Sequence, residues 1–265
     1  MGVVNLTPDS FSDGGRYLEP DPALARALAI AAEGAAIIDL GGESTRPGAA
    51  PVPLEEELRR VLPLLRRLRP RTEAILSVDT SKPEVMRAAA AAGADLINDV
   101  YALRAPGALE ALSESGCAVC LMHMQGEPRT MQHAPHYEDV LAEVCAFLRE
   151  RVEACRAAGI ADERIVLDPG FGFGKTLEHN LTLLRHLGEL RIDGLPVLAG
   201  LSRKSMIGTL TGRLCAQRVY GSVAAALIAA QNGARILRVH DVAATVDALK
   251  VLQAVAAGPP QRVRP

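Results

Sequence analysis

The chain alternates short apolar runs with longer segments whose apolar residues recur at helical spacing. The short runs are continuous, which is typical of parallel strands buried on both faces. They predict strands over residues 3–5, 36–40, 74–79, 96–100, 118–122, 165–168, 197–200 and 236–239. The longer segments predict helices over residues 21–34, 53–68, 83–92, 139–158, 177–187, 221–232 and 241–256.

Strict alternation of strands and helices indicates a parallel sheet in a single α/β domain. Eight such units in about 250 residues favour a closed (β/α)8 TIM barrel. An open doubly wound sheet is the alternative. We expect residues 1–257 to form the barrel and residues 258–265, GPPQRVRP, to be a disordered tail.

The composition excludes several classes of protein. A hydrophobic content of 49% excludes general disorder, and a net charge of −2 argues against a nucleic-acid partner. Aromatic residues make up only 3%, so a base-stacking surface is not expected either. We expect no signal peptide, since the first residues have no basic segment followed by an apolar one, and no apolar run reaches the roughly 20 residues that a membrane span needs.

The cysteines indicate a reducing compartment, and we expect a cytoplasmic protein. Their number, five, is odd, which is unlike a disulfide framework. Cys117 and Cys120 form a CxxC pair, but a strand there directs them to opposite faces, which argues against a shared metal.

Every predicted strand is followed by polar or glycine-rich residues, whereas the opposite strand ends carry plain turns. In a barrel the carboxyl ends of all strands meet on one face, where active sites lie. Helix capping explains some of these residues, but not the carboxylates and the amide near the strand ends. Those residues are Asp39, Asp79, Asn98 and Asp168.

Two chemistries follow from these residues. The first is recognition of a flat, amide-rich heterocycle by Asp79, Asn98 and Asp168, with Lys204 as an additional donor. These side chains offer the acceptors and donors that ring N–H and carbonyl groups require.

The second chemistry is phosphate binding. Cationic or potentially cationic side chains follow the second, seventh and eighth strands, and arginine suits phosphate through its planar fork. They are Arg46, Arg203, Arg238 and His240. Asn5 offers a neutral oxygen for a Mg²⁺ ion that phosphate and water also hold.

Two motifs are misleading. Residues 170–176, GFGFGKT, resemble a phosphate-binding loop, but that motif needs glycine where Pro169 stands. His123, His133 and His136 lack the spacing of a helical metal site.

Eight segments, taken in order, strongly resemble the dihydropteroate synthase family, the folate-pathway enzymes inhibited by sulfonamides. The resemblance extends over essentially the whole chain. The segments are NLTPDSFSDGG (5–15), DLGGESTRPGA (39–49), SVDTSKPEV (77–85), INDV (97–100), MHMQGEPRTMQ (122–132), LDPGFGFGKT (167–176), GLSRKSMIG (200–208) and RVHDV (238–242).

The resemblance implies a transferase that condenses 6-hydroxymethyl-7,8-dihydropterin pyrophosphate with 4-aminobenzoate, giving 7,8-dihydropteroate and pyrophosphate. The implied pterin site is Asp79, Asn98, Met122, Asp168, Gly172, Gly200, Lys204 and Arg238. The implied pyrophosphate and Mg²⁺ site is Asn5, Arg46, Arg238 and His240, with Asn5 as the metal ligand. The implied 4-aminobenzoate site is Thr45, Arg46, Pro47, Phe173, Lys204 and Ser205. The implied catalytic residues are Asp79, Asp168, Lys204, Arg238 and His240.

The family also implies a homodimer and a reaction in which pyrophosphate leaves before the amine attacks. Its members usually have an N-terminal β-hairpin, whereas this sequence opens directly at the first predicted strand. Of the few aromatic residues, Phe11, Phe171 and Phe173 fall in loops of the implied site, where we expect them to enclose an aromatic substrate.

Three other functions stay open from the residues. The first is a pterin-binding methyltransferase, and the second is a pterin-binding protein without activity. The third is an aldolase that forms a Schiff base on Lys204.

Overall fold

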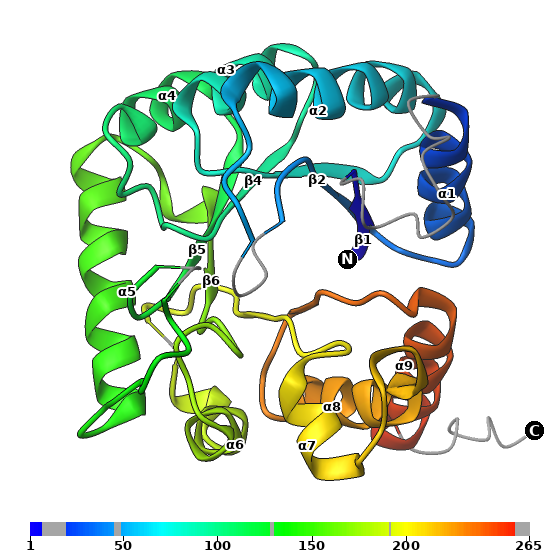
Figure 1. Ribbon diagram of the computed structural model, residues 1–265, viewed down its shortest axis with the longest axis vertical. Coiled ribbons are helices and arrows are strands. Elements are labelled where there is room, and N and C mark those ends of the chain that lie inside the picture. The colour runs from blue at the N-terminus through cyan, green and yellow to red at the C-terminus, as the bar shows by residue number, and fades with distance from the viewer. Residues whose placement is uncertain (7–19, 45–48, 128–129, 191, 258–265) are drawn as a thin grey trace, which may run out of the picture.

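The computed structural model describes residues 1–6, 20–44, 49–127, 130–190 and 192–257. In it, helices surround a ring of strands (Figure 1). The strands are β1 (Gly2–Asn5), β2 (Ile37–Gly41), β3 (Ile75–Asp79), β4 (Leu96–Asp99), β5 (Ala118–Met122), β6 (Ile165–Asp168), β7 (Leu198–Ala199) and β8 (Ile236–Leu237). The α-helices are α1 (Pro20–Ala32), α2 (Leu54–Leu68), α3 (Pro83–Ala91), α4 (Ala108–Ser115), α5 (Val140–Ala157), α6 (Leu177–Arg185), α7 (Ser205–Thr211), α8 (Val219–Gln231) and α9 (Val242–Ala257).

The strands form a closed parallel barrel in sequence order. β1 to β6 pair successively in one sheet, and β7 pairs with β8. A parallel bridge between Leu167 and Val197 joins β6 to the β7 side, and one between Gly2 and Val239 joins β8 to β1. The amide of Val3 donates to the carbonyl of Val239 at 3.2 Å across this junction. The (β/α)8 prediction is confirmed, and the doubly wound alternative is wrong.

Two helices were not predicted from the sequence. α4 begins after Gly107, which has a left-handed φ of 82° and supplies no side-chain cap. α7 has only seven residues and ends at Gly212. Neither helix therefore has the capping residue or the length on which sequence patterns depend. α5, by contrast, begins at Asp139, whose carboxylate accepts from the amides of Leu141 and Ala142.

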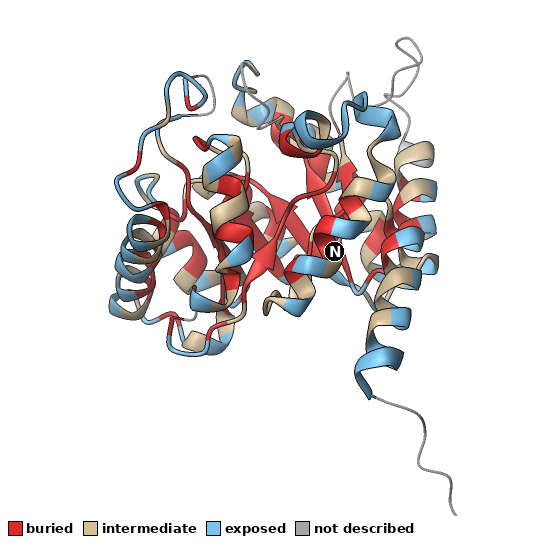
Figure 2. Ribbon diagram, turned by 90° about the horizontal axis from the view of Figure 1, so that it is seen from below, coloured by how far each residue is buried: buried red, intermediate tan, exposed pale blue. Residues whose placement is uncertain are grey.

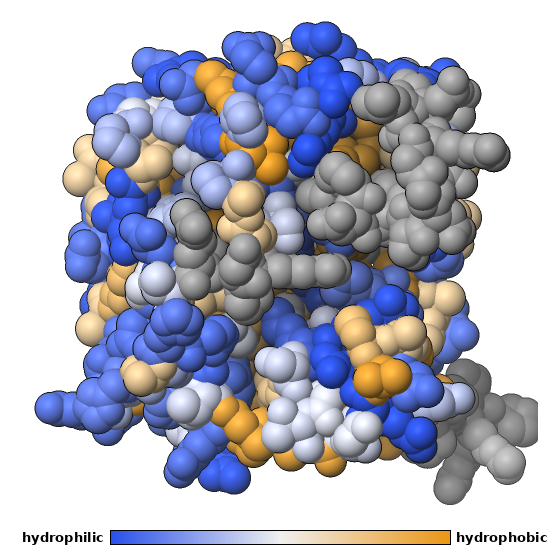
Figure 3. Space-filling model, in the orientation of Figure 1, coloured by the Kyte–Doolittle hydropathy of each residue, from blue (hydrophilic) through white to orange (hydrophobic). Residues whose placement is uncertain are grey.

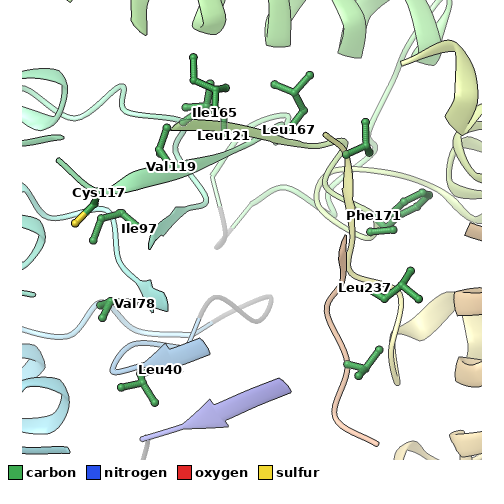
Figure 4. Close-up of a cluster of buried hydrophobic side chains, with 14 of the residues drawn as sticks. Leu40, Val78, Ile97, Cys117, Val119, Leu121, Ile165, Leu167, Phe171 and Leu237 are labelled. Carbon is green, nitrogen blue, oxygen red and sulfur yellow. The ribbon is translucent and has the colours of Figure 1, made fainter. Parts of the chain in front are cut away.

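Hydrophobic side chains pack on both sides of the strands. An outer cluster fills the space between strands and helices and includes Leu40, Ile97, Leu121 and Leu167 (Figure 4). An inner cluster lies inside the barrel and contains Ile37, Leu96, Cys120, Val166 and Leu198. Figure 2 shows the result: buried residues occupy the strands and the helix faces that meet them, and exposed residues form the outer surface.

The positions of the cysteines and the lengths of the helices can be compared with the sequence predictions. Cys117 belongs to the outer cluster and Cys120 to the inner one, so the two thiols lie on opposite sides of the sheet, as predicted. All five cysteines are free. Among the residues that the structure describes, no helix is long and apolar enough to cross a membrane. Residues 258–265, the expected tail, lie outside the described residues.

Candidate active site

The polar residues near the strand ends lie inside the barrel because of strand periodicity. Side chains alternate between the two faces of a strand, so a residue two positions after an inner-cluster residue also points inward. Asp39, Asn98, Met122, Asp168 and Gly200 each follow an inner-cluster residue by two positions. The strand register brings them together, with Asp79 beside Asn98 and Met122 beside Asp168.

Arg238, directly after β8, joins two carboxylates of neighbouring strands. Its Nε lies 2.7 Å from Oδ2 of Asp39, and its Nη2 lies 2.8 Å from Oδ2 of Asp79. Asp39 is completely buried, and it also accepts from the hydroxyl of Ser77 at 2.6 Å. Its other donor is the amide nitrogen of Asn98, at 3.4 Å. One arginine therefore fixes the inner wall formed by β2, β3 and β4.

The carboxylates of Asp79 and Asp168 are both buried. Burial raises the pKa of Asp79, and the neighbouring Arg238 opposes this rise. Burial likewise raises the pKa of Asp168, and Lys204 is the largest opposing influence. Asp168 also accepts a hydrogen bond from the amide of Gly170 at 2.7 Å. The neighbouring cations thus offset only part of the rise in pKa that burial causes in both carboxyl groups.

Lys204 precedes α7 and extends back over the end of the barrel. Its ammonium donates to the carbonyl of Phe171 and lies 4.7 Å from the centre of the Phe173 ring. A Cβ on Gly172 would stand 3.2 Å from its Cδ, and one on Gly200 would stand 3.8 Å from its Nζ. The two glycines therefore leave the space that the lysine occupies. Burial lowers the pKa of Lys204 to about 8, and Arg238 contributes while Asp168 opposes.

The aromatic residues of the β6–α6 loop have different roles. Phe173 is half-buried against Met122, Met124 and Met131. Phe171 is fully buried in the outer cluster (Figure 4). The expectation that Phe171 encloses the substrate is therefore wrong: its backbone carbonyl faces Lys204, while its ring stabilises the core. Phe11 lies outside the described residues.

Residues that follow β7 form hydrogen bonds with residues that follow β8. His240 Nδ1 lies 3.1 Å from the hydroxyl of Ser202, and the His240 amide donates to the same hydroxyl. Arg203, a candidate for phosphate, instead pairs with Asp241, with Nε 3.0 Å from Oδ2. Ser205 is exposed at the start of α7. Arg238, the first residue after β8, therefore faces the inner wall of the barrel, and His240 contacts Ser202 two positions later in the chain.

The β2–α2 loop is anchored by a partly buried ion-pair cluster. The ammonium of Lys82 contacts the carboxylates of both Glu43 and Glu57. Glu57 is completely buried, and Glu43 accepts from the amide of Val52 at 3.3 Å. This cluster holds both ends of the segment that carries Thr45, Arg46 and Pro47, which themselves lie outside the described residues.

Asn5 ends β1 next to Gly41 and Asp79. Its Oδ1 would lie 3.7 Å from a Cβ on Gly41, and the register places Gly41 beside Asp79. The described residues hold no group of three or more His, Cys, Asp or Glu side chains that could bind a metal. Arg238 pairs with both Asp39 and Asp79, whereas the side-chain oxygen of Asn5 at this corner is neutral.

Figure 3 views the molecule in the orientation of Figure 1, and its described surface is mostly hydrophilic and hollowed near the centre. Sequence reasoning missed three residues that contact the predicted site residues or anchor their loop: Ser77, Lys82 and Ser202. It also missed the contact of Asp39 with Arg238. The signal for Asp39 was present, since a strand carboxylate in an apolar run needs a partner. The partner itself is 199 residues away in the chain.

The comparisons agree with this geometry. The family model described as "Pterin binding enzyme" matches residues 1–240. The dihydropteroate synthase of Escherichia coli is 55% identical over 254 residues, which are 96% of this chain and 90% of that protein.

Two solved structures of Xanthomonas albilineans dihydropteroate synthase are also similar. One, with 4-aminobenzoic acid, has a TM-score of 0.93 and 62% identity, covering 98% of this chain and 93% of that one. The other, in complex with 7,8-dihydropteroate, has a TM-score of 0.89 and 58% identity, covering 98% and 94%. The chain therefore belongs to the pterin-binding enzyme family and, within it, to the dihydropteroate synthases.

Proposed function

We infer that this chain condenses 6-hydroxymethyl-7,8-dihydropterin pyrophosphate with 4-aminobenzoate, and we propose which residues hold each substrate. The observation that carries the assignment is the convergence of two buried carboxylates, an amide and a lysine at one end of the barrel. These are Asp79, Asn98, Asp168 and Lys204.

The pterin ring binds between these polar side chains. The carboxylates of Asp79 and Asp168 accept from ring N–H groups, and Asn98 can both donate and accept. Lys204 donates to the ring carbonyl. Met122, Gly172 and Gly200 line the slot, and the two glycines leave room for both Lys204 and the ring.

Pyrophosphate binds on the side of β1, β2 and β8. Arg238, Arg46 and His240 supply positive charge or hydrogen-bond donors, which suit a phosphate leaving group. Asn5 would hold Mg²⁺ through its side-chain oxygen, which is the kind of hard, neutral donor that this ion accepts. When bound, the ion supplies positive charge toward the leaving group.

4-Aminobenzoate binds above the pterin, against the ring of Phe173. The ammonium of Lys204 lies over that ring, so it is available to both substrates. The pocket is completed by Thr45, Arg46 and Pro47 from the β2–α2 loop and by Ser205 from α7. The ion pairs of Lys82 with Glu43 and Glu57 anchor the β2–α2 loop.

The reaction needs no enzyme nucleophile. The bond between the pterin methylene carbon and the pyrophosphate oxygen breaks, and the electron pair leaves with pyrophosphate. The cationic side chains stabilise the charge that develops on the leaving group. Asp79 and Asp168 stabilise the positive methylene-pterin. The amine of 4-aminobenzoate then attacks this carbon, forms the C–N bond and loses one proton.

We further propose that the protein is a cytoplasmic homodimer. Large hydrophobic side chains are exposed on and next to the neighbouring helices α7, α8 and α9, which is typical of a protein interface. They are Leu210, Leu214, Tyr220, Ile228, Val251 and Val255. The five free cysteines fit a reducing compartment.

A pyrophosphate-release assay tests the proposed reaction. Purified protein, pterin pyrophosphate and Mg²⁺ are incubated with and without 4-aminobenzoate. We expect release that depends on 4-aminobenzoate. Equal release without it would indicate hydrolysis, and binding of the pterin substrate without release would indicate an inactive pterin-binding protein.

A further inference from the structure

Lys175 is a buried lysine that the proposed mechanism does not use. Its side chain is almost inaccessible to solvent, and its Nζ makes three contacts inside the protein. They are His123 Nδ1 at 2.9 Å, the carbonyl of Gly170 at 3.0 Å and the carbonyl of Phe173 at 3.0 Å. The lysine of the GFGFGKT segment therefore points into the protein, where it cannot reach a phosphate.

His123 is a neutral partner for this lysine. Burial and the charge of Lys175 lower the pKa of His123 far below its usual range. Burial lowers the pKa of Lys175 to about 7, and Asp168 opposes this change. In its ammonium form the lysine can only donate, so Nδ1 of the neutral imidazole then accepts and the ring proton lies on Nε2. The ring packs edge-on against Phe147, with centroids 5.0 Å apart. His123 is therefore a fixed acceptor rather than a metal ligand.

The β6–α6 loop lies flat against this pair. A Cβ on Gly170 would stand 1.8 Å from the carbonyl oxygen of His123, and Gly170 has a left-handed φ of 68°, so only glycine fits there. Asn180 accepts from the Gly172 amide at 2.7 Å, and the hydroxyl of Tyr137 donates to the Gly174 carbonyl at 2.8 Å. Contacts from Lys175, Asn180 and Tyr137 therefore fix the backbone of the loop between Gly170 and Gly174.

The same loop contacts Lys204 on its other side. The Phe171 carbonyl accepts a hydrogen bond from Lys204, and the ring of Phe173 lies against its ammonium group. Gly172, which has no side chain, leaves space for the lysine. The two lysines thus contact the same loop through different groups. Lys175 binds the carbonyl of Phe173, and the ring of that residue faces Lys204.

We propose that Lys175 is a positioning residue: with His123 it fixes the β6–α6 loop so that Phe171 and Phe173 hold Lys204 in place. The link to 4-aminobenzoate rests on the proposed function, whereas the link between the two lysines does not. A lysine suits this position because one Nζ can donate to three acceptors grouped around a point, whereas the planar fork of arginine cannot.

Lysine NMR tests the link without substrate. The chain has four lysines, Lys82, Lys175, Lys204 and Lys250, so ¹⁵N labelling of lysine side chains gives few signals to assign. We expect the Lys175→Met variant to shift the Lys204 signal and its titration midpoint. Lys250→Met, at a surface lysine, is the matched control and leaves both unchanged.

Kinetics test what the link does. We expect Lys175→Met to raise KM for 4-aminobenzoate roughly tenfold, the loss expected from one positioning contact. Affinity for pterin pyrophosphate is expected to fall by a smaller factor, because Lys204 contacts both substrates in the proposed site whereas Phe173 contacts 4-aminobenzoate alone. His123→Leu, which removes only the acceptor, is expected to act in the same direction and serves if Lys175→Met does not fold.

The outcomes separate the two proposals. An unchanged Lys204 signal in a folded Lys175→Met or His123→Leu protein would overturn the positioning role, whatever the activity. An unchanged KM for 4-aminobenzoate in such a variant would also overturn it, because Phe173 and Lys204 would then be placed without Lys175. A shifted Lys204 signal in a protein that makes no dihydropteroate would leave the link standing and reject the proposed function instead.

Discussion

Nε of Arg238, the residue directly after β8, lies 2.7 Å from Oδ2 of Asp39 in β2, in the interior of the barrel. The carboxylate is completely buried and has two further donors, Ser77 and Asn98. Asp39 therefore orients Arg238 and the side-chain amide of Asn98, two residues of the proposed pterin site, while remaining completely buried beneath them.

Replacing this carboxylate tests that role. We expect Asp39→Asn to lower the free energy of unfolding by about 1–3 kcal/mol, less than for a fully broken buried pair because Arg238 keeps Asp79. We also expect weaker binding of pterin pyrophosphate. Denaturant unfolding and calorimetry measure the two effects. Asp247→Asn, at an exposed pair with Lys250, is the control and should change neither. Unaltered pterin affinity in Asp39→Asn would show that Arg238 does not depend on Asp39.

The anchor of the β2–α2 loop makes a second prediction. Lys82→Met leaves the completely buried Glu57 without its cation, so we expect a loss of about 2–4 kcal/mol in the free energy of unfolding. We also expect a higher KM for 4-aminobenzoate. The double variant Lys82→Met/Glu57→Gln removes both charges and is expected to recover part of the stability, because replacing both partners costs less than replacing one. A double variant no more stable than Lys82→Met would contradict the ion-pair explanation.

The ring of Phe173 makes a third prediction. We expect Phe173→Leu to raise KM for 4-aminobenzoate several-fold, since a ring contact with a cation contributes about 0.5–2 kcal/mol. Phe173→Tyr keeps the ring and is the control. Steady-state kinetics with each substrate varied separately distinguish the two sites. An equal effect of Leu and Tyr would argue against a contact through the ring face.

Lys204 predicts a pH dependence. Burial lowers its pKa to about 8, so the ammonium is lost as the pH rises through 8, and kcat/KM is expected to fall above that pH. Stability changes in the opposite sense. Between pH 8 and 10.5, the pKa of the lysine in the unfolded chain, the unfolded state binds more protons at Lys204 than the folded state does. The contribution of Lys204 to the free energy of unfolding therefore rises with pH in this range. Profiles of Lys204→Met should lack both changes. Retention of the fall above pH 8 in that variant would assign it to another group.

Much of the fold could be predicted because its signals are local. The eight strands lie within one or two residues of their predicted ends, since continuous apolar runs between helices mark doubly buried strands. α4 could not be predicted, because it begins at a left-handed glycine without a side-chain cap.

The site divides in the same way. Which strand ends carry Asp79, Asn98 and Asp168 follows from periodicity and register. The contacts of Arg238 with Asp39 and of Lys175 with His123 do not, because they join residues 199 and 52 positions apart. The error on Phe171 has a similar cause: the direction of a loop side chain depends on backbone turns, here at Gly170 and Gly172, that no periodic pattern encodes.

The central claim is that this barrel forms a C–N bond between two substrates held by its strand ends. Reaction with 4-aminobenzoate carrying ¹⁵N in its amino group, followed by mass spectrometry and pyrophosphate measurement, tests it directly. We predict ¹⁵N-labelled 7,8-dihydropteroate and one pyrophosphate released for each product molecule. Release of pyrophosphate without labelled product, or no reaction by folded protein with both substrates and Mg²⁺, would contradict it.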